Sequence, residues 1–129
     1  MSRNHLALML LMGGLAIFTL LFGSCKITDT SVVSGPIVHM GQTTFLKPAI
    51  TIKKGDKLLL IDNVNSLHII KNGTWQGTVQ KTGIEPGAPT VSQTFSGNDR
   101  ASIGPFTQAG LFQLYCTVHQ GMNLAVTVQ

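Results

Sequence analysis

Short segments in which apolar and polar residues alternate dominate the chain from residue 36 onward. A period of two is typical of strands that bury one face. The pattern predicts short strands at residues 37–40, 43–46, 49–53, 57–63, 67–71, 90–95, 110–116 and 123–128, with a further candidate at residues 101–104. Seven or eight short strands with turns between them, and no sustained helical period outside the N-terminus, predict an all-β, two-sheet β-sandwich.

Glycine and proline mark the connections between these segments. A tight turn is predicted at Lys54-Gly55-Asp56, because glycine permits the positive φ that such turns need. Residues 72–89, NGTWQGTVQKTGIEPGAP, predict a long irregular excursion with room for a helical turn. We interpret Trp75, within this excursion, as a packing residue.

The N-terminus has a different pattern. Arg3 is followed by an uncharged apolar run from Leu6 to Phe22 and then by small residues before Cys25, which describes an export signal. Small residues directly before a cysteine resemble the bacterial lipobox, in which the cysteine receives lipid, although that motif usually has leucine where this chain has Phe22. We predict residues 1–24 as a signal peptide or an uncleaved membrane anchor, residues 25–35 as a tether, and residues 36–129 as one domain.

Both alternatives place the domain on the outer face of the cytoplasmic membrane, held there by lipid on Cys25 or by the anchor. Two cysteines in an exported chain ordinarily indicate a disulfide. If Cys25 is lipidated, however, Cys116 becomes a lone thiol in an exported domain. Such a thiol is a liability unless something occupies it, and a metal ion would do so.

Charge and composition exclude several functions. The formal net charge is +4, and the lysines are scattered apart from the pair Lys53 and Lys54. Nucleic-acid binding requires clustered phosphate contacts, so we expect none, whereas a mild positive field can steer an acidic protein partner. The chain has no recognisable nucleophile–base–acid set, phosphate loop or paired carboxylates, so we do not expect an enzyme.

The stretch LYCTVHQGMNL, residues 114–124, places Cys116, His119 and Met122 three residues apart. These residues lie between two predicted strands and therefore share one tight loop at an end of the sandwich. Two histidines, one cysteine and a weak axial methionine define the blue-copper site, and His68, which opens an apolar strand upstream, is the candidate for the other histidine. Each residue taken singly has an ordinary structural role, but the set in this order predicts a metal site.

These residues are similar to those of the cupredoxins, the small blue-copper proteins that include plastocyanin, pseudoazurin and amicyanin. The similarity covers most of residues 36–129, through FLKPAITIKKGDKLLLIDN, then His68, then GLFQLYCTVHQGM. The Cys-x2-His-x2-Met spacing resembles the short loop of amicyanins more than the longer loop of plastocyanins. The resemblance implies a Greek-key β-sandwich that holds one type 1 copper through His68, Cys116, His119 and Met122.

The same resemblance implies one-electron transfer between larger redox proteins, which would dock transiently on a monomer near His119. Two positions depart from the family pattern: Ile69 stands where asparagine is frequent, and Val118 where proline is frequent. The alternatives are a protein that stores or delivers copper on the outer face of the membrane and a structural module without metal.

Overall fold

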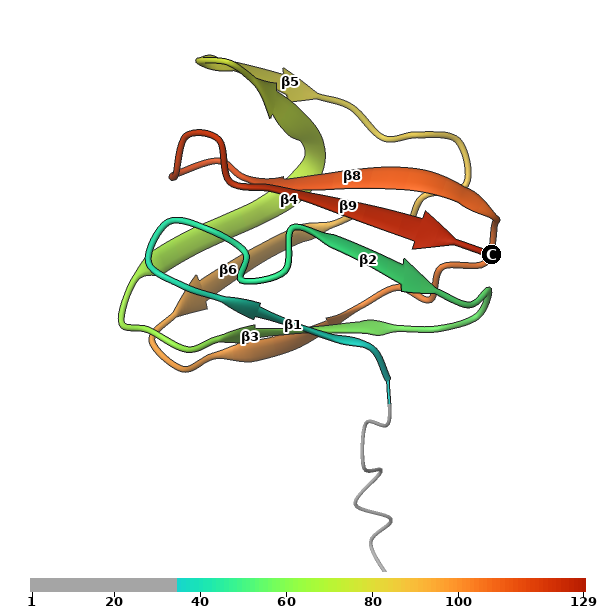
Figure 1. Ribbon diagram of the computed structural model, residues 1–129, viewed down its shortest axis with the longest axis horizontal. Coiled ribbons are helices and arrows are strands. Elements are labelled where there is room, and N and C mark those ends of the chain that lie inside the picture. Colours follow the sequence, from blue (N-terminus) through green and yellow to red (C-terminus); the bar gives the residue numbers. More distant parts are fainter. Residues whose placement is uncertain (1–34) are drawn as a thin grey trace, which may run out of the picture. The chain divides into compact units, whose positions relative to one another are not determined.

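The computed structural model describes residues 35–129, which form an all-β sandwich of two sheets (Figure 1). The predicted export signal, most of the tether and Cys25 lie outside the described residues. The strands are β1 (Ile37–Met40), β2 (Ala49–Ile52), β3 (Leu58–Asp62), β4 (Leu67–Gln76), β5 (Val79–Thr82), β6 (Ser92–Ser96), β7 (Arg100–Ile103), β8 (Gly110–Cys116) and β9 (Asn123–Val128). The predicted fold class is confirmed, and the candidate strand at residues 101–104 is β7.

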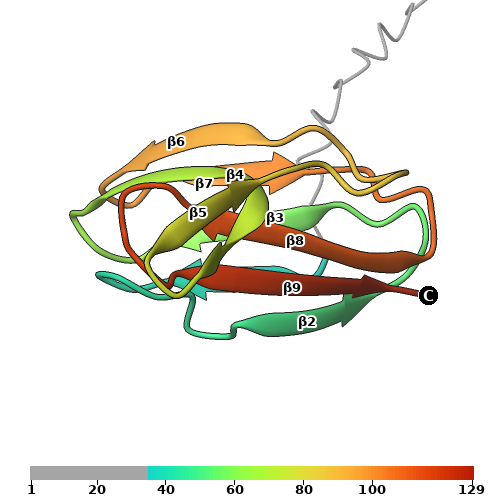
Figure 2. The same cartoon turned by 90° about the horizontal axis from the view of Figure 1, so that it is seen from above.

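The two sheets are both mixed. The smaller has the strand order β1-β3-β7, with β1 parallel to β3 and β7 antiparallel to it. The larger has the order β2-β9-β8-β4-β5, with β6 also pairing with β4, and its only parallel pair among the described strands is β2 with β9. Figure 2 shows β2 and β6 at opposite edges of the larger sheet.

The core lies between the sheets and is built by the alternation seen in the sequence. Val38 and Met40 of β1 are fully buried, as is Leu60 of β3. They belong to one apolar cluster with residues of the larger sheet, including Leu114 and Val126. Burial of apolar surface between the two sheets is therefore the main stabilising contribution to this fold.

The predicted turn after β2 is confirmed and connects the two sheets. The Asp56 N–H donates to the Lys53 carbonyl at 3.1 Å, and the Lys53 N–H donates to the Asp56 carboxylate at 2.9 Å. Gly55, at the third position of the turn, has φ = 90°. A positive φ there is the requirement of a type II turn, which explains the glycine.

The predicted strand at residues 43–46 is wrong. The chain turns back directly after β1, because the Gly41 N–H donates to the Thr44 carbonyl at 2.8 Å. Only a single bridge, between Met40 and Phe45, pairs this segment with a strand. Phe45 is buried, so the apolar residues of this segment anchor a loop to the core rather than form a ladder.

The irregular excursion predicted for residues 72–89 is wrong in its first half, and no helical turn occurs in it. Strand β4 continues to Gln76 and forms a hairpin with β5 through a two-residue loop, Gly77-Thr78. Gly77 has φ = 59°, as a primed hairpin turn requires at its first loop position. Gly73 and Gly77 indicate a loop in the sequence alone, whereas they are the bend and turn residues of this hairpin.

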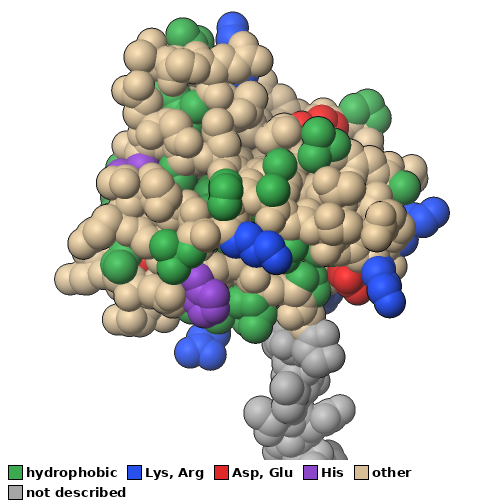
Figure 3. Space-filling view, viewed as in Figure 1, with side chains coloured by type: hydrophobic (Ala, Val, Ile, Leu, Met, Phe, Trp, Pro, Cys, Tyr) green, Lys and Arg blue, Asp and Glu red, His purple; other side chains and the backbone are tan. Residues whose placement is uncertain are grey.

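Lysine and arginine side chains are scattered over the face seen in Figure 3, without a continuous stripe on that face. Within residues 35–129 there is no helix that could cross a membrane.

Candidate metal centre

His68 is the second residue of β4 and points into the sandwich. The alternation of β4 buries His68 and Ile70 completely, while Leu67 and Lys71 on the opposite face are exposed. His68 pairs in register with Phe95 of β6, which is also fully buried. The strand thus places an imidazole in an apolar environment at one end of the larger sheet.

Cys116 is the last residue of β8 and begins a closed loop. Its N–H donates to the Met122 carbonyl at 3.0 Å, and the Met122 N–H donates to the His119 carbonyl at 3.2 Å. These two bonds fold residues 116–122, here called the ligand loop, back on itself. The loop therefore returns His119 to the side of Cys116, with the cysteine fully buried and the histidine half-buried.

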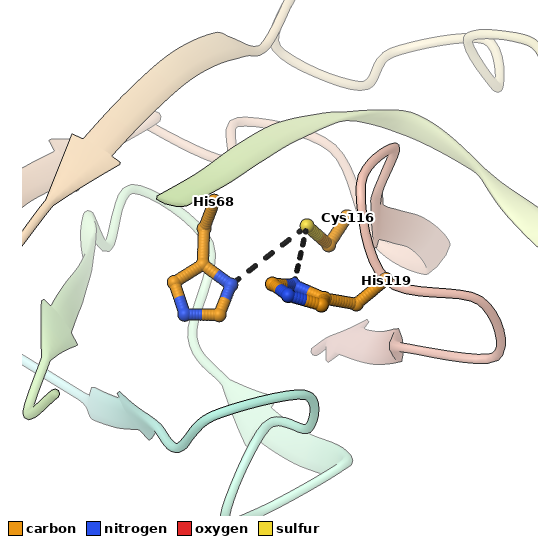
Figure 4. Close-up of side chains that lie close together, drawn as sticks. All are labelled: His68, Cys116 and His119. Carbon is orange, nitrogen blue, oxygen red and sulfur yellow. Dashed lines mark hydrogen bonds between the residues drawn. The ribbon is translucent and has the colours of Figure 1, made fainter. Parts of the chain in front are cut away.

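The three side chains converge on one point (Figure 4). The Cys116 Sγ lies 3.8 Å from the His68 Nδ1 and 3.6 Å from the His119 Nδ1. The ring centroids of the two histidines are 4.8 Å apart, and all three candidate ligand atoms lie within 4.8 Å of one another. Both histidines thus turn the same nitrogen towards the sulfur, so the group could hold a single metal ion.

Met122, the fourth predicted ligand, is buried at the end of the ligand loop and belongs to the apolar core cluster. Its role as an axial ligand stays a prediction. His39, the other described histidine, is exposed and its Nδ1 lies 3.0 Å from the Asn63 Oδ1, away from this group.

The electrostatics of the site favour a neutral His68. Burial lowers the pKa of His68 below its ordinary value of 6.5, and the nearby His119 lowers it further, while Asp62 and the Gly41 backbone act in the opposite direction. A neutral imidazole is the form that binds a metal, so burial prepares this histidine as a ligand.

Asp62 was missed by the sequence analysis. It ends β3, is almost fully buried, and places its Oδ1 3.7 Å from the His68 Nε2, on the side of the ring away from Cys116. Neither the His68 Nε2 nor the Asp62 Oδ2 has a hydrogen-bond partner within the described residues. A carboxylate beside one ring nitrogen favours the tautomer with hydrogen on that nitrogen, which leaves the lone pair of Nδ1 for a metal.

The residue after His68 holds the ligand loop by its backbone. The Thr117 N–H donates to the Ile69 carbonyl at 2.8 Å, so this attachment does not depend on the Ile69 side chain. The replacement of the family's frequent asparagine by Ile69 therefore leaves the loop tied to β4.

Trp75 was also missed as a site residue, because it was assigned to an irregular segment. Its indole Nε1 donates to the Cys116 carbonyl at 2.7 Å. The sequence signal that could have revealed it is the two-residue turn Gly77-Thr78, which allows β4 to continue through Trp75 to Gln76.

The chemistry of the three candidate ligand atoms limits which metal ions the site would bind. A thiolate with two imidazoles is a soft to borderline set, which suits copper or zinc and does not suit the oxygen-seeking calcium or magnesium. The buried sulfur and the apolar surroundings further exclude water from most of the site.

The sandwich and its group of two histidines and a cysteine at one end define the class: the chain has a cupredoxin-like fold. No family model matches the sequence, and no curated protein does. The solved structures that this chain is similar to include amicyanins. Amicyanin from Paracoccus versutus (Thiobacillus versutus) matches with a TM-score of 0.57 at 21% identity, over 74% of this chain and 82% of that one.

Two amicyanin variants match similarly. A proline-to-glycine variant in the reduced Cu(I) form at pH 4 has a TM-score of 0.57 at 20% identity, over 74% of this chain and 83% of that one. An oxidised proline-to-glycine variant has a TM-score of 0.56 at 19% identity, over 81% of this chain and 88% of that one. At these identities the comparisons establish the fold, and the predicted resemblance to cupredoxins is confirmed at that level.

Proposed function

We propose that this protein is a blue-copper electron carrier that binds one copper ion through His68, Cys116, His119 and Met122. The observation that carries the proposal is the convergence of His68, from β4, with Cys116 and His119, from the ligand loop. Copper is the metal whose ligand preference fits two imidazoles and a thiolate, with the thioether of Met122 as the proposed fourth ligand. The amicyanin likeness supports the same choice.

Bound copper supplies a one-electron couple between its cuprous and cupric states. The chain holds the ligand atoms at fixed positions on a β-sheet and a hydrogen-bonded loop, so the geometry changes little when the charge changes. Full burial of His68 and Cys116 keeps water out. These properties suit an electron carrier.

Electrons enter and leave, in this proposal, at the half-buried His119. Its neighbour Val118 is 45% exposed, which provides an apolar contact for a redox protein. The net charge of +4 favours an acidic partner. Docking is transient, since a carrier must release its partner after each transfer. In this proposal the protein acts as a monomer.

We propose further that the domain is exported and tethered to the outer face of the cytoplasmic membrane, by lipid on Cys25 or by an uncleaved N-terminal anchor. The support is the apolar run from Leu6 to Phe22 and the small residues before Cys25. Mass spectrometry of the protein isolated from membranes distinguishes a lipidated Cys25 from an intact N-terminus.

The test of the copper site is a titration of the metal-free full-length protein with one equivalent of Cu(II). An intense thiolate-to-copper charge-transfer band in the visible range, bleached by ascorbate, is expected. The band should be absent in Cys116→Ser, which removes the thiolate. Weak absorption that is the same in both proteins would contradict the proposal.

A copper storage or delivery protein is the alternative that this experiment should also address. Such a protein must release its metal readily, whereas a carrier must retain it through many turnovers. Rapid loss of the band to a competing Cu(I) chelator, after reduction, would favour the delivery function.

A further inference from the structure

The hairpin formed by residues 73–82, here called the β4–β5 hairpin, lies beside the ligand loop. Figure 1 shows it above the ends of β8 and β9 that the ligand loop connects. The hairpin leaves the plane of its sheet at Gly73, a buried residue with φ = 125°. A Cβ at this position would clash with the Lys81 carbonyl oxygen, so the close approach of the two hairpin strands requires glycine.

Trp75 makes the central contact between the hairpin and the loop. Its indole N–H donates to the carbonyl of Cys116 at 2.7 Å. Its ring also packs edge-on against Tyr115, with centroids 6.2 Å apart and planes at 87°. The tryptophan is therefore bonded to the backbone of the candidate thiolate ligand itself.

Asn123 fixes the backbone of Trp75 in turn. The Trp75 N–H donates to the Asn123 Oδ1 at 2.7 Å, and the Asn123 Nδ2 donates to the Trp75 carbonyl at 3.1 Å. Asn123 directly follows the candidate ligand Met122. Both ends of the ligand loop are thus connected to the same tryptophan.

Gln80 of β5 adds a second attachment. Its Nε2 donates to the Thr117 carbonyl at 3.1 Å, and its Oε1 accepts from the Tyr115 hydroxyl at 3.3 Å. On the other side, the N–H groups of Cys116 and Thr117 are bonded to the carbonyls of Met122 and Ile69. The N–H and C=O groups of both residues at the start of the loop are therefore all occupied.

From these contacts we propose that the β4–β5 hairpin is a clamp that holds the ligand loop in its metal-binding conformation before the metal arrives, with Trp75 as the positioning residue for Cys116. The inference rests on the proposed function in that it takes the loop residues as ligands. Clamping has a direct chemical consequence: the cysteine and histidine do not have to be ordered by the metal, and they cannot move far when the metal changes its charge.

The first test measures hydrogen exchange by NMR in the metal-free full-length protein. The chain has one tryptophan, so the indole N–H gives one assignable signal, which should be protected from exchange. Trp75→Phe keeps an aromatic ring but removes the donor. The amides of Cys116 and Thr117 should then exchange about fivefold faster, the effect of losing one hydrogen bond.

Two controls, the amide of Leu60 and the variant Gln76→Ala, separate clamping of the ligand loop from general stability. The amide of Leu60, in the centre of the smaller sheet, should not change; equal acceleration there would mean that Trp75 supports the whole domain and would overturn the proposal. Gln80→Ala tests the second attachment with little risk to folding, because Gln80 is exposed. Gln76 is another exposed glutamine of the same hairpin, and Gln76→Ala should leave exchange in the ligand loop unchanged.

A second measurement uses copper. If the wild-type protein forms the thiolate-to-copper band, Trp75→Phe should shift that band and accelerate copper loss to a chelator, while Gln76→Ala should do neither. Unchanged spectra and release rates in Trp75→Phe would overturn the clamp. Absence of the band in the wild type would instead contradict the proposed copper function, and the exchange rates of the metal-free protein would still decide whether the hairpin orders the loop.

Discussion

At the residue scale, the pair of Asp62 and His68 is the most informative feature of the site. Each side chain is buried, and the Asp62 Oδ1 lies 3.7 Å from the His68 Nε2. The other ring nitrogen faces the Cys116 Sγ at 3.8 Å. A carboxylate placed behind a candidate ligand in this way would bring negative charge close to a bound metal ion. For the proposed copper ion, that charge would favour the more positive, cupric state.

The corresponding prediction concerns Asp62→Asn, which removes the charge and keeps an oxygen acceptor. The reduction potential should rise, and the affinity for Cu(II) should fall about 10- to 100-fold, the usual effect of changing a group behind a ligand. A redox titration followed at the visible band gives the potential, and competition with a chelator gives the affinity.

Asp56→Asn is the matched control. It removes the same charge at the turn between β2 and β3, at the far end of β3 from Asp62. Equal shifts of the potential in the two variants would show that only net charge matters, and the specific role of Asp62 would be wrong.

At the element scale, β4 connects the candidate metal ligands with the hairpin. One strand carries His68 at its second position and Trp75 next to its last, and it pairs with β6, β8 and β5 along its length. The change of partner takes place around Gly73, the residue whose φ of 125° other residues adopt only with strain. The shape of the site thus depends on the bend of a single strand.

Gly73→Ala should therefore destabilise the protein by at least about 2 kcal/mol, because backbone strain at such a residue adds to a clash with the Lys81 carbonyl. Urea unfolding of the metal-free protein measures the change. Gly83→Ala is the control, since an added Cβ there meets nothing within 4 Å and its free energy of unfolding should stay within about 0.5 kcal/mol of wild type. Similar losses in the two variants would contradict the assigned role of Gly73.

At the scale of the whole molecule, the two candidate ligand histidines differ in their exposure to solvent. His68 is fully buried between the sheets, whereas His119 is half-buried on the ligand loop. The exposed Val118 lies beside it in the loop. One end of the sandwich therefore combines the candidate metal group with a partly apolar surface, and this end is the proposed docking surface.

Electron self-exchange between reduced and oxidised copies tests this surface without a known partner. Val118→Glu places like charges opposite each other when two copies meet at His119, and the rate should fall at least about tenfold. NMR line broadening in mixtures of the two redox states measures the rate. Leu111→Glu is the control, because Leu111 is similarly exposed, 54% against 45%, but lies near the start of β8, at the opposite end of that strand from Cys116, and should have little effect. Equal rates in the two variants would place docking elsewhere.

The sequence by itself determined the fold class and most of the site. Alternation along residues 110–116 predicts a strand, and the structure buries Phe112 and Leu114 on one face of it and exposes Leu111 on the other, because the separation of two strand faces is a local property. The spacing of Cys116 and His119 was equally informative, since a three-residue separation on one tight loop keeps the two residues close together. Strand β4 was predicted only as far as residue 71, because its second half contains the glycines that usually signal a loop.

Only the tertiary structure decided what surrounds the ligands. Trp75 and Asn123 are 48 positions apart in the sequence, and no local pattern indicates that they are bonded. Asp62 lies close to His68 in the sequence, yet its approach depends on how the loop between β3 and β4 passes from the smaller sheet to the larger. Sequence periodicity indicates which residues share one face of a strand. The residues that contact one another across sheets and hairpins are decided by the packing of the whole chain. That packing completes the candidate metal centre.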